Sequence, residues 1–139
     1  MKRILVALDN STRAPFVLQT ASRLAAMTDS DVILYRAVTA QPLDVEQLAS
    51  AARAEDVLVR RAHTELEELA KSCKAPIEAI IANLATPADG ILHTARERDA
   101  DMIVIGSHGH GLLERLIGTT AQKVVERADR NVLVARTLL

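Results

Sequence analysis

The sequence contains very few aromatic residues and no excess of either charge. Only 1% of the 139 residues are aromatic, with one Tyr, one Phe and no Trp. RNA-recognition and single-strand-binding modules stack bases on aromatic side chains, so this composition argues against both classes. A formal net charge of -1 supplies no field that would recruit nucleic acid or acidic lipid. We therefore expect neither nucleic acid nor a membrane among the partners.

Cysteine and long apolar runs are also scarce. Cys73 is the single cysteine and cannot form a disulfide within the chain. The N-terminal run from Met1 reaches Asp9 too soon to hold the apolar region of a secretory signal peptide. No apolar stretch approaches the roughly 20 residues of a membrane-spanning helix. These features predict a cytoplasmic protein.

What is present is an ordinary globular composition, with 49% hydrophobic and 25% charged residues. A chain of this length buries roughly two thirds of its unfolded surface, which is enough for a core without disulfides or metals. The linkers are too short for a second domain. We expect one domain over residues 1–139.

Short apolar runs rich in Val and Ile alternate with stretches of helical periodicity. The runs predict strands buried on both faces. They are Ile4 to Leu8, Val32 to Val38, Ile77 to Ala82, Met102 to Ile105 and Val132 to Ala135. Helices are expected over residues 12–28, 44–74 and 118–128, and a further helix is expected to begin at Thr86 and to bury Ile91, Leu92 and Ala95. Strict alternation predicts an α/β fold with a doubly wound parallel sheet, whose ligands bind beyond the carboxyl ends of the strands.

The helix boundaries rest on local capping signals. Ser11 is the expected N-cap of the first helix, Asp44 with Gln47 resembles a capping box for the second, and Thr86 caps the third. The expected buried stripe of the second helix is Leu48, Ala52, Leu58, Ala62, Leu66 and Leu69. The last helix should bury Ala121, Val124 and Val125.

Glycine clusters directly after the fourth predicted strand. The cluster is Gly106, Gly109, Gly111 and Gly118, and it ends at Thr119 and Thr120, which open the last helix. Glycines let a ligand approach the main chain closely, and a helix start favours an anion. The segment therefore suits a polyphosphate.

The familiar phosphate motifs do not match this segment. A Walker A loop requires a lysine after its last glycine, but Thr119 follows Gly118. The dinucleotide fingerprint requires a third glycine where Leu112, Leu113 and Glu114 stand. No Cys or carboxylate accompanies His108 and His110 at ligand spacing, so we expect no metal site built from protein clusters.

The whole chain resembles the universal stress protein family of the UspA type. That family carries Gly, two residues, Gly, nine residues, Gly and then Ser or Thr. Gly106 and Gly109 match the first pair and Gly118-Thr119 the last, with eight residues at 110–117 in place of nine. The first strand with Asp9 and the last strand also match the family's pattern.

The resemblance implies a five-stranded sheet in the order 3-2-1-4-5 with helices on both faces, and an adenine-nucleotide site. In nucleotide-binding members an aspartate after the first strand contacts the ribose, which Asp9 matches, and Ala7 and Ala37 would flank the adenine. The implied phosphate contacts are Gly106, His108, Gly109, His110, Gly118, Thr119 and Thr120. The ligand would be ATP or AMP, with or without Mg²⁺.

Three functions remain open on the sequence. The first is an ATP-binding regulator of the stress response with little or no hydrolysis, because the sequence shows no evident combination of a catalytic nucleophile with a general base. The second is a nucleotide phosphate hydrolase or transferase, and the third is a ligand-free dimeric interaction module. The resemblance also implies a homodimer through the edge strand Asn131 to Thr137.

Overall fold

Strands and helices alternate along the whole described chain. The computed structural model describes residues 1–39, 48–107 and 117–136, and of residues 48–52 the backbone alone. The elements are β1 (Arg3–Ala7), α1 (Ala14–Thr28), β2 (Asp31–Val38), α2 (Leu48–Ala70), β3 (Ile77–Leu84), α3 (Pro87–Glu97), β4 (Met102–Gly106), α4 (Thr119–Arg127) and β5 (Asn131–Ala135). This order confirms the alternation that the apolar runs and helical periods predict.

The five strands form one parallel sheet in the order β3-β2-β1-β4-β5. The predicted fold class and strand order are therefore confirmed. Strand β1 lies at the centre, where Ala7 is paired with Tyr35 of β2 on one side and with Ile105 of β4 on the other. The chain winds outward from β1 in both directions, which places the reversal of winding between β1 and β4.

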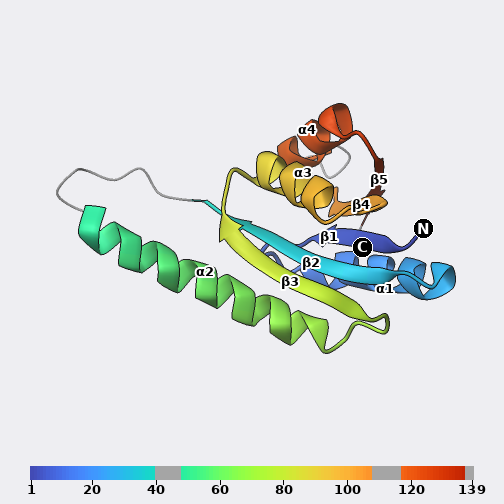
Figure 1. Cartoon of the computed structure of the whole chain (residues 1–139), viewed down its shortest axis with the longest axis horizontal. Coiled ribbons are helices and arrows are strands. Elements are labelled where there is room, and N and C mark those ends of the chain that lie inside the picture. Colours follow the sequence, from blue (N-terminus) through green and yellow to red (C-terminus); the bar gives the residue numbers. More distant parts are fainter. Residues whose placement is uncertain (40–47, 108–116, 137–139) are drawn as a thin grey trace.

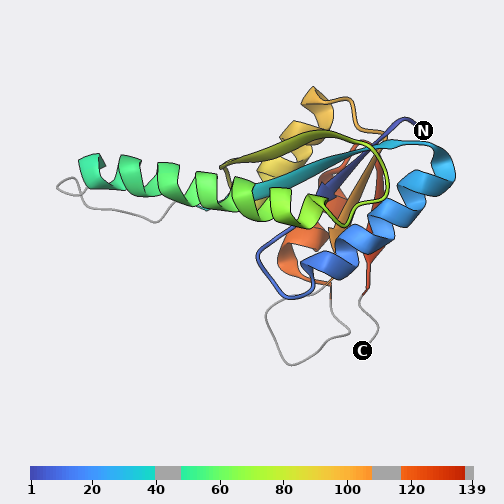
Figure 2. The same cartoon turned by 90° about the horizontal axis from the view of Figure 1, so that it is seen from below.

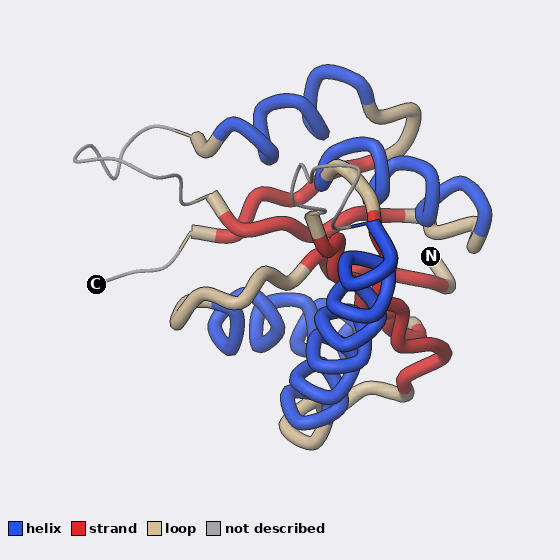
Figure 3. Tube along the Cα trace, turned by 90° about the vertical axis from the view of Figure 1, so that its left-hand side faces the viewer, coloured by secondary structure: helices blue, strands red, loops and turns tan. Residues whose placement is uncertain are grey.

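Helices cover both faces of the sheet (Figure 1). Ile4 and Val6 of β1 are fully buried in the core that also contains Leu66 of α2, on the face covered by α1 and α2. Leu5 points to the opposite face and packs in a second core with Ile91 of α3. In Figure 3 the strands lie between these helical layers.

The two edge strands are less buried than the sequence pattern predicts. Most residues of β3 and β5 are half-buried or exposed, whereas the middle residues of β1, β2 and β4 are buried. Burial on both faces is thus right for the central strands and wrong for β3 and β5. An edge strand has a neighbour on one side only, so helices cover it incompletely.

The N-terminal part of α2 extends past the end of the sheet (Figure 1 and Figure 2). Leu58, expected in the buried stripe, is 37% exposed, whereas Ala62 and Leu66 further along are buried. The prediction for Leu58 is therefore wrong, because the sheet ends before that turn of the helix. The proposed capping box at Asp44 and Gln47 lies outside the described residues, and the helix ends at Ala70, earlier than residue 74.

Two further local predictions are corrected by the structure. Helix α1 has Arg13 rather than Ser11 as its N-cap, because the Ser11 hydroxyl accepts the Arg13 N–H in a turn before the helix. On α4, Ala121 and Val124 are buried as expected, but Val125 is 48% exposed and faces away from the sheet. Thr86 is the N-cap of α3 as predicted, although its hydroxyl bonds the Asp89 carboxylate rather than a backbone N–H.

Across residues 1–39, 48–107 and 117–136, no helix is both long enough and apolar enough to span a membrane.

Candidate functional site

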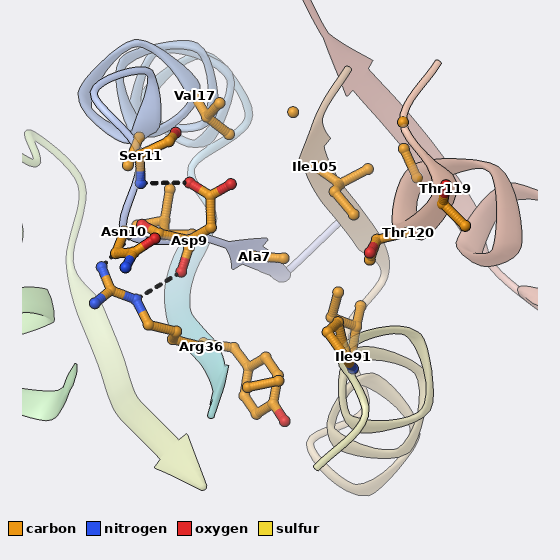
Figure 4. Close-up of a pocket in the computed structure, with 18 residues that line it drawn as sticks. Ala7, Asp9, Asn10, Ser11, Val17, Arg36, Ile91, Ile105, Thr119 and Thr120 are labelled. Carbon is orange, nitrogen blue, oxygen red and sulfur yellow. Dashed lines mark hydrogen bonds between the residues drawn. The ribbon is translucent and has the colours of Figure 1, made fainter. Parts of the chain in front are cut away.

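A cavity of about 510 Å³ opens at the carboxyl ends of the central strands. Ala7 of β1, Ala37 of β2 and Gly106 of β4 form part of its lining, and all three have small side chains or none. Apolar walls are supplied by Val17, Ile91 and Ile105 (Figure 4). The cavity exists because β1 and β4 send their following helices to opposite faces of the sheet, which leaves a crevice between the strand ends.

The polar side of the cavity comes from the loop after β1. The Leu8 N–H still follows the sheet, donating to the Tyr35 carbonyl at 2.9 Å. Asp9 then turns the chain, with its Oδ1 accepting the Ser11 N–H at 3.0 Å. In Figure 4 the second carboxylate oxygen of Asp9 points away from Ser11 and toward the part of the cavity that Ile105 lines. The loop thus presents a carboxylate to the cavity.

The start of α4 forms the opposite rim. Gly118 is the N-cap, and its N–H donates to the Ser107 carbonyl at 2.9 Å. The helix has no side-chain cap and no acidic residue in its first turn. The first N–H groups of a helix lack intrahelical acceptors and carry the positive end of the helix dipole. Because Gly118, Thr119 and Thr120 line the cavity, this rim favours an anion.

Two other helices begin at the same cavity. Ala14, the first residue of α1, and Pro87, the first residue of α3, both line it. The positive dipole end of α3 is partly offset by Asp89 in its first turn, and Arg127 of α4 pairs with that carboxylate at 2.7 Å. The Arg127 guanidinium bond is the largest cause of the lowered pKa of Asp89. The start of α4 therefore favours an anion more strongly than the start of α3 does.

Arg36 is a cavity residue that the sequence analysis missed. Its side chain is 9% exposed, and it donates from Nε to the Leu8 carbonyl at 3.0 Å and from Nη2 to the Asp9 carbonyl at 2.9 Å. Nη1 pairs with Glu65 of α2. The available signal was an arginine inside the apolar run of β2, since a buried guanidinium persists only where its donors are bonded.

A second overlooked group lies beside Arg36. Tyr35 lines the cavity, is fully buried, and donates its hydroxyl to Asn83 of β3 at 2.6 Å. Burial raises the pKa of the Tyr35 phenol, and a hydrogen bond with Thr94 opposes that rise. A Cβ at Gly90 would lie 2.1 Å from the Tyr35 hydroxyl oxygen, so α3 can approach this ring only through a glycine. Gly90 stands outside the glycine cluster that the sequence singles out.

The structure brings most of the predicted site residues to one cavity. Those that line it are Ala7, Asp9, Ala37, Gly106, Gly118, Thr119 and Thr120. His108, Gly109 and His110 lie outside the described residues. His63 and His93 lie on helices and face Glu67 and Glu97 one turn away. Among the residues that the structure describes, no group of three or more His, Cys, Asp or Glu is placed to hold a metal ion.

The family assignment comes from the sequence as a whole. The sequence model of the universal stress protein family matches residues 1–136. The chain belongs to the universal stress protein family. It is 30% identical to universal stress protein A homolog 2 of Coxiella burnetii, over 97% of this chain and 94% of that protein.

Solved universal stress protein structures share the fold of this family member. The UspA structure from Lactobacillus plantarum superposes with a TM-score of 0.82 at 22% identity, covering 97% of each chain. A universal stress protein solved in complex with cAMP has a TM-score of 0.69 at 24% identity, over 99% of this chain and 98% of that one. One from Archaeoglobus fulgidus, solved in complex with dAMP, has a TM-score of 0.61 at 24% identity, over 96% and 97%.

Proposed function

We propose that this universal stress protein binds an adenine nucleotide, ATP or AMP, in the cavity at the carboxyl ends of β1, β2 and β4, and acts as a stress-response regulator with little or no hydrolysis. The observation that carries the proposal is the cavity itself, where a carboxylate, an uncapped helix start and small strand-end residues face one another. Two related proteins of the same fold were solved with the adenine nucleotides cAMP and dAMP, which supports this ligand class.

Adenine recognition is assigned to the backbone of Ala37. The Tyr35 carbonyl faces β1, where it accepts the Leu8 N–H, whereas the Val38 carbonyl faces β3 and accepts the Ala85 N–H. By the alternation of a strand, the peptide groups of Ala37 face the β1 side, beyond the last β1–β2 pair of Ala7 and Tyr35. An N–H donor beside a C=O acceptor matches N1 and the N6 amino group of adenine. Hypoxanthine and guanine present the opposite pattern there.

Ribose and phosphate binding are assigned to the two polar rims. Asp9 accepts hydrogen bonds from the ribose hydroxyls, and the first N–H groups of α4 with Thr119 and Thr120 hold the phosphates. His108, Gly109 and His110 belong to the same proposal on the strength of the family pattern. Mg²⁺ usually binds nucleotide phosphates, waters and one or two carboxylates. Asp9 is the carboxylate that the described cavity lining offers for it.

Slow turnover follows from the charges around the cavity. Catalysis of phosphoryl transfer requires positively charged groups in contact with the transferring phosphoryl group, typically Lys, Arg or Mg²⁺. Among the described lining residues Arg36 is the basic one, and its guanidinium is bonded to Leu8, Asp9 and Glu65. We therefore expect ATP to be held rather than hydrolysed.

Calorimetric titration with ATP and with inosine triphosphate tests this proposal. The two ligands share ribose and phosphates and differ only in the base edge that Ala37 would read. We expect ATP to bind at least about tenfold more tightly, because the inosine edge leaves buried polar groups mismatched. Equal binding of both removes the adenine assignment, and no heat with ATP, AMP or adenosine removes the proposed function. Steady phosphate release on the order of one per second would instead favour the hydrolase alternative.

We further propose that residues 1–139 act as one universal stress protein domain that pairs with a second copy through β5. This strand is bonded to β4 on one side only and lies at the sheet edge. The Ala135 carbonyl accepts the Ser107 N–H and so faces β4, which directs the peptide groups of Val134 to the open edge. Val134→Pro removes an outward donor and should give a monomer in sedimentation. A dimer that persists would place the interface elsewhere.

A further inference from the structure

Arg36 is a charged, buried residue near the carboxyl end of β2. It stands between Tyr35 and Ala37, which both line the nucleotide cavity. Burying a guanidinium away from water is unfavourable unless its donors are paired. The way this arginine is paired therefore shows what it does in the fold.

All of its described partners belong to the loop after β1 or to α2. Nε donates to the Leu8 carbonyl at 3.0 Å and Nη2 to the Asp9 carbonyl at 2.9 Å. Figure 4 shows the guanidinium beside the Asp9–Asn10 turn. Because each peptide unit is planar, fixing these two carbonyls also fixes the directions of the Asp9 and Asn10 N–H groups. Arg36 thus holds the backbone on both sides of the Asp9 side chain.

The third partner extends this arrangement to a helix on the face of the sheet. Nη1 of Arg36 pairs with Glu65, whose side chain is 47% exposed. The next residue, Leu66, is fully buried in the core beneath α2. Glu65 therefore stands on the part of α2 that is packed against the sheet, and Arg36 joins that part to the loop that carries Asp9.

We propose that Arg36 is a positioning residue for nucleotide binding: it holds the Leu8–Asp9 backbone so that the Asp9 carboxylate meets the ribose, and Glu65 keeps the guanidinium in that place. The proposal rests on the proposed function for its ligand but not for its structural part. Arg36 acts through Asp9 and does not itself hold the phosphates.

The chain supplies a matched control at the other end of the sheet. Arg130 also donates to two backbone carbonyls, Ala95 at 3.0 Å and Ala100 at 2.7 Å, and pairs with a carboxylate, Asp129. It does not line the cavity. Arg36→Lys and Arg130→Lys are thus the same chemical change, in which a single ammonium replaces a fork that bonds several acceptors.

The first experiment compares calorimetric titrations of both variants with ATP, adenosine and 2′,3′-dideoxyadenosine triphosphate. Arg36→Lys should weaken ATP and adenosine equally, by about tenfold, as one misplaced bond to an ionised group implies. It should change the affinity for the dideoxy ligand by less than about twofold, because that ligand has no ribose hydroxyls to bond with Asp9. Arg130→Lys should leave all three affinities unchanged.

Other patterns overturn the proposal. A loss with both triphosphates but not with adenosine would make Arg36 a phosphate ligand. An equal loss with all three ligands would mean a general collapse of the cavity. Unchanged affinity throughout would leave Arg36 without a role in binding. In the double variant Asp9→Ala with Arg36→Lys, ATP should bind no more weakly than to Asp9→Ala alone, and additive losses contradict the proposal.

A second experiment needs no ligand and separates this proposal from the proposed function. Amide hydrogen exchange of Ser11, whose N–H donates to Asp9 Oδ1, should be at least about threefold faster in Arg36→Lys than in the wild type and unchanged in Arg130→Lys. Glu65→Gln, which keeps the arginine, should produce a smaller increase in the Ser11 exchange rate. This variant replaces Arg36→Lys as the test if Arg36→Lys does not fold. Unchanged Ser11 exchange in these variants overturns the positioning role even if ATP binds. If ATP does not bind but exchange responds as expected, only the proposed function fails.

Discussion

The two ends of the parallel sheet use the same kinds of side chain in different arrangements. At the amino end, the Asp101 carboxylate accepts the N–H groups of Lys2 and Arg3 at 2.7 and 2.8 Å. At the carboxyl end, the Asp9 carboxylate accepts the Ser11 N–H of its own loop and stands at a cavity of about 510 Å³. One aspartate ties two strands together, whereas the other leaves the strand ends apart.

The arginines repeat this difference. Arg130 joins the end of α3 to the start of β4 by bonding the Ala95 and Ala100 carbonyls. Arg36 donates to the Leu8 and Asp9 carbonyls of the loop after β1, and this loop lines the cavity. We infer from this difference that the hydrogen bonds at the amino end contribute to stability, whereas the cavity at the carboxyl end is the proposed ligand site. Changes at the two ends should therefore separate stability from binding.

A large loss of stability is expected where α3 packs against the Tyr35 ring. Gly90→Ala places a Cβ 2.1 Å from the Tyr35 hydroxyl oxygen and 2.8 Å from the Ala85 Cβ. We expect a loss of about 1–3 kcal/mol in the free energy of unfolding, measured by urea titration, because a packed core resists added volume.

Tyr35→Phe supplies the control for this steric explanation. It removes the hydroxyl that the new Cβ would meet, so Gly90→Ala should destabilise the Phe background less than the wild type. Equal destabilisation in both backgrounds would show that contact with the Tyr35 hydroxyl oxygen is not the cause.

Substituting the aspartate at each end of the sheet, Asp9 and Asp101, separates binding from stability most directly. Asp9→Ala should weaken ATP binding about tenfold to a hundredfold by losing a bond of roughly 1.5–3 kcal/mol to a charged group, with little change in stability. Asp101→Ala should lower the free energy of unfolding and leave ATP affinity unchanged. Calorimetry and urea titration on both variants check this. Equal weakening of ATP binding by Asp101→Ala and Asp9→Ala would contradict the separation of the two ends.

A smaller effect is expected from pH at the amino end. Backbone hydrogen bonds from Lys2 and Arg3 hold the pKa of Asp101 below its usual value. A carboxyl whose pKa is lowered by folding stabilises the native state above its unfolded pKa, and that contribution is lost as the pH falls through the folded pKa. Stability should therefore decline below about pH 4, and less steeply in Asp101→Asn. Parallel pH profiles for wild type and variant would contradict this, and the exposed position of Asp101 keeps the effect small.

The fold could be predicted from sequence because its signals are local. Apolar runs such as residues 4–8 and 102–105 and the helical period of α1 mark the elements, and their alternation predicts a doubly wound parallel sheet. The order of the strands came from the resemblance to the family. The errors arise where the outcome depends on distant parts of the chain. Leu58 is exposed because the sheet ends beneath α2, and Ser11 is not an N-cap because the turn around Asp9 delays the helix.

The site divides in the same way. The positions of Gly106 and Gly118 at the cavity could be predicted because a glycine cluster after a strand is visible in the sequence, whereas the expectation for Asp9 came from the resemblance to the family. The Arg36–Glu65 pair joins residues 29 positions apart, and Tyr35 meets Asn83 across 48 positions. Neither pairing follows from local spacing, since each depends on how α2 and β3 pack against β2.

The adenine nucleotide is proposed to bind at the carboxyl end of the sheet. Chemical-shift mapping of ¹⁵N-labelled protein titrated with AMP tests this proposal most directly, because every backbone amide reports separately. We expect the largest shifts at Asp9, Ala37, Thr119 and Thr120, and none at Lys2, Ala100 or Arg130 around the amino end. Saturable shifts concentrated at the amino end, or no shifts with AMP or ATP at millimolar concentration, would contradict it.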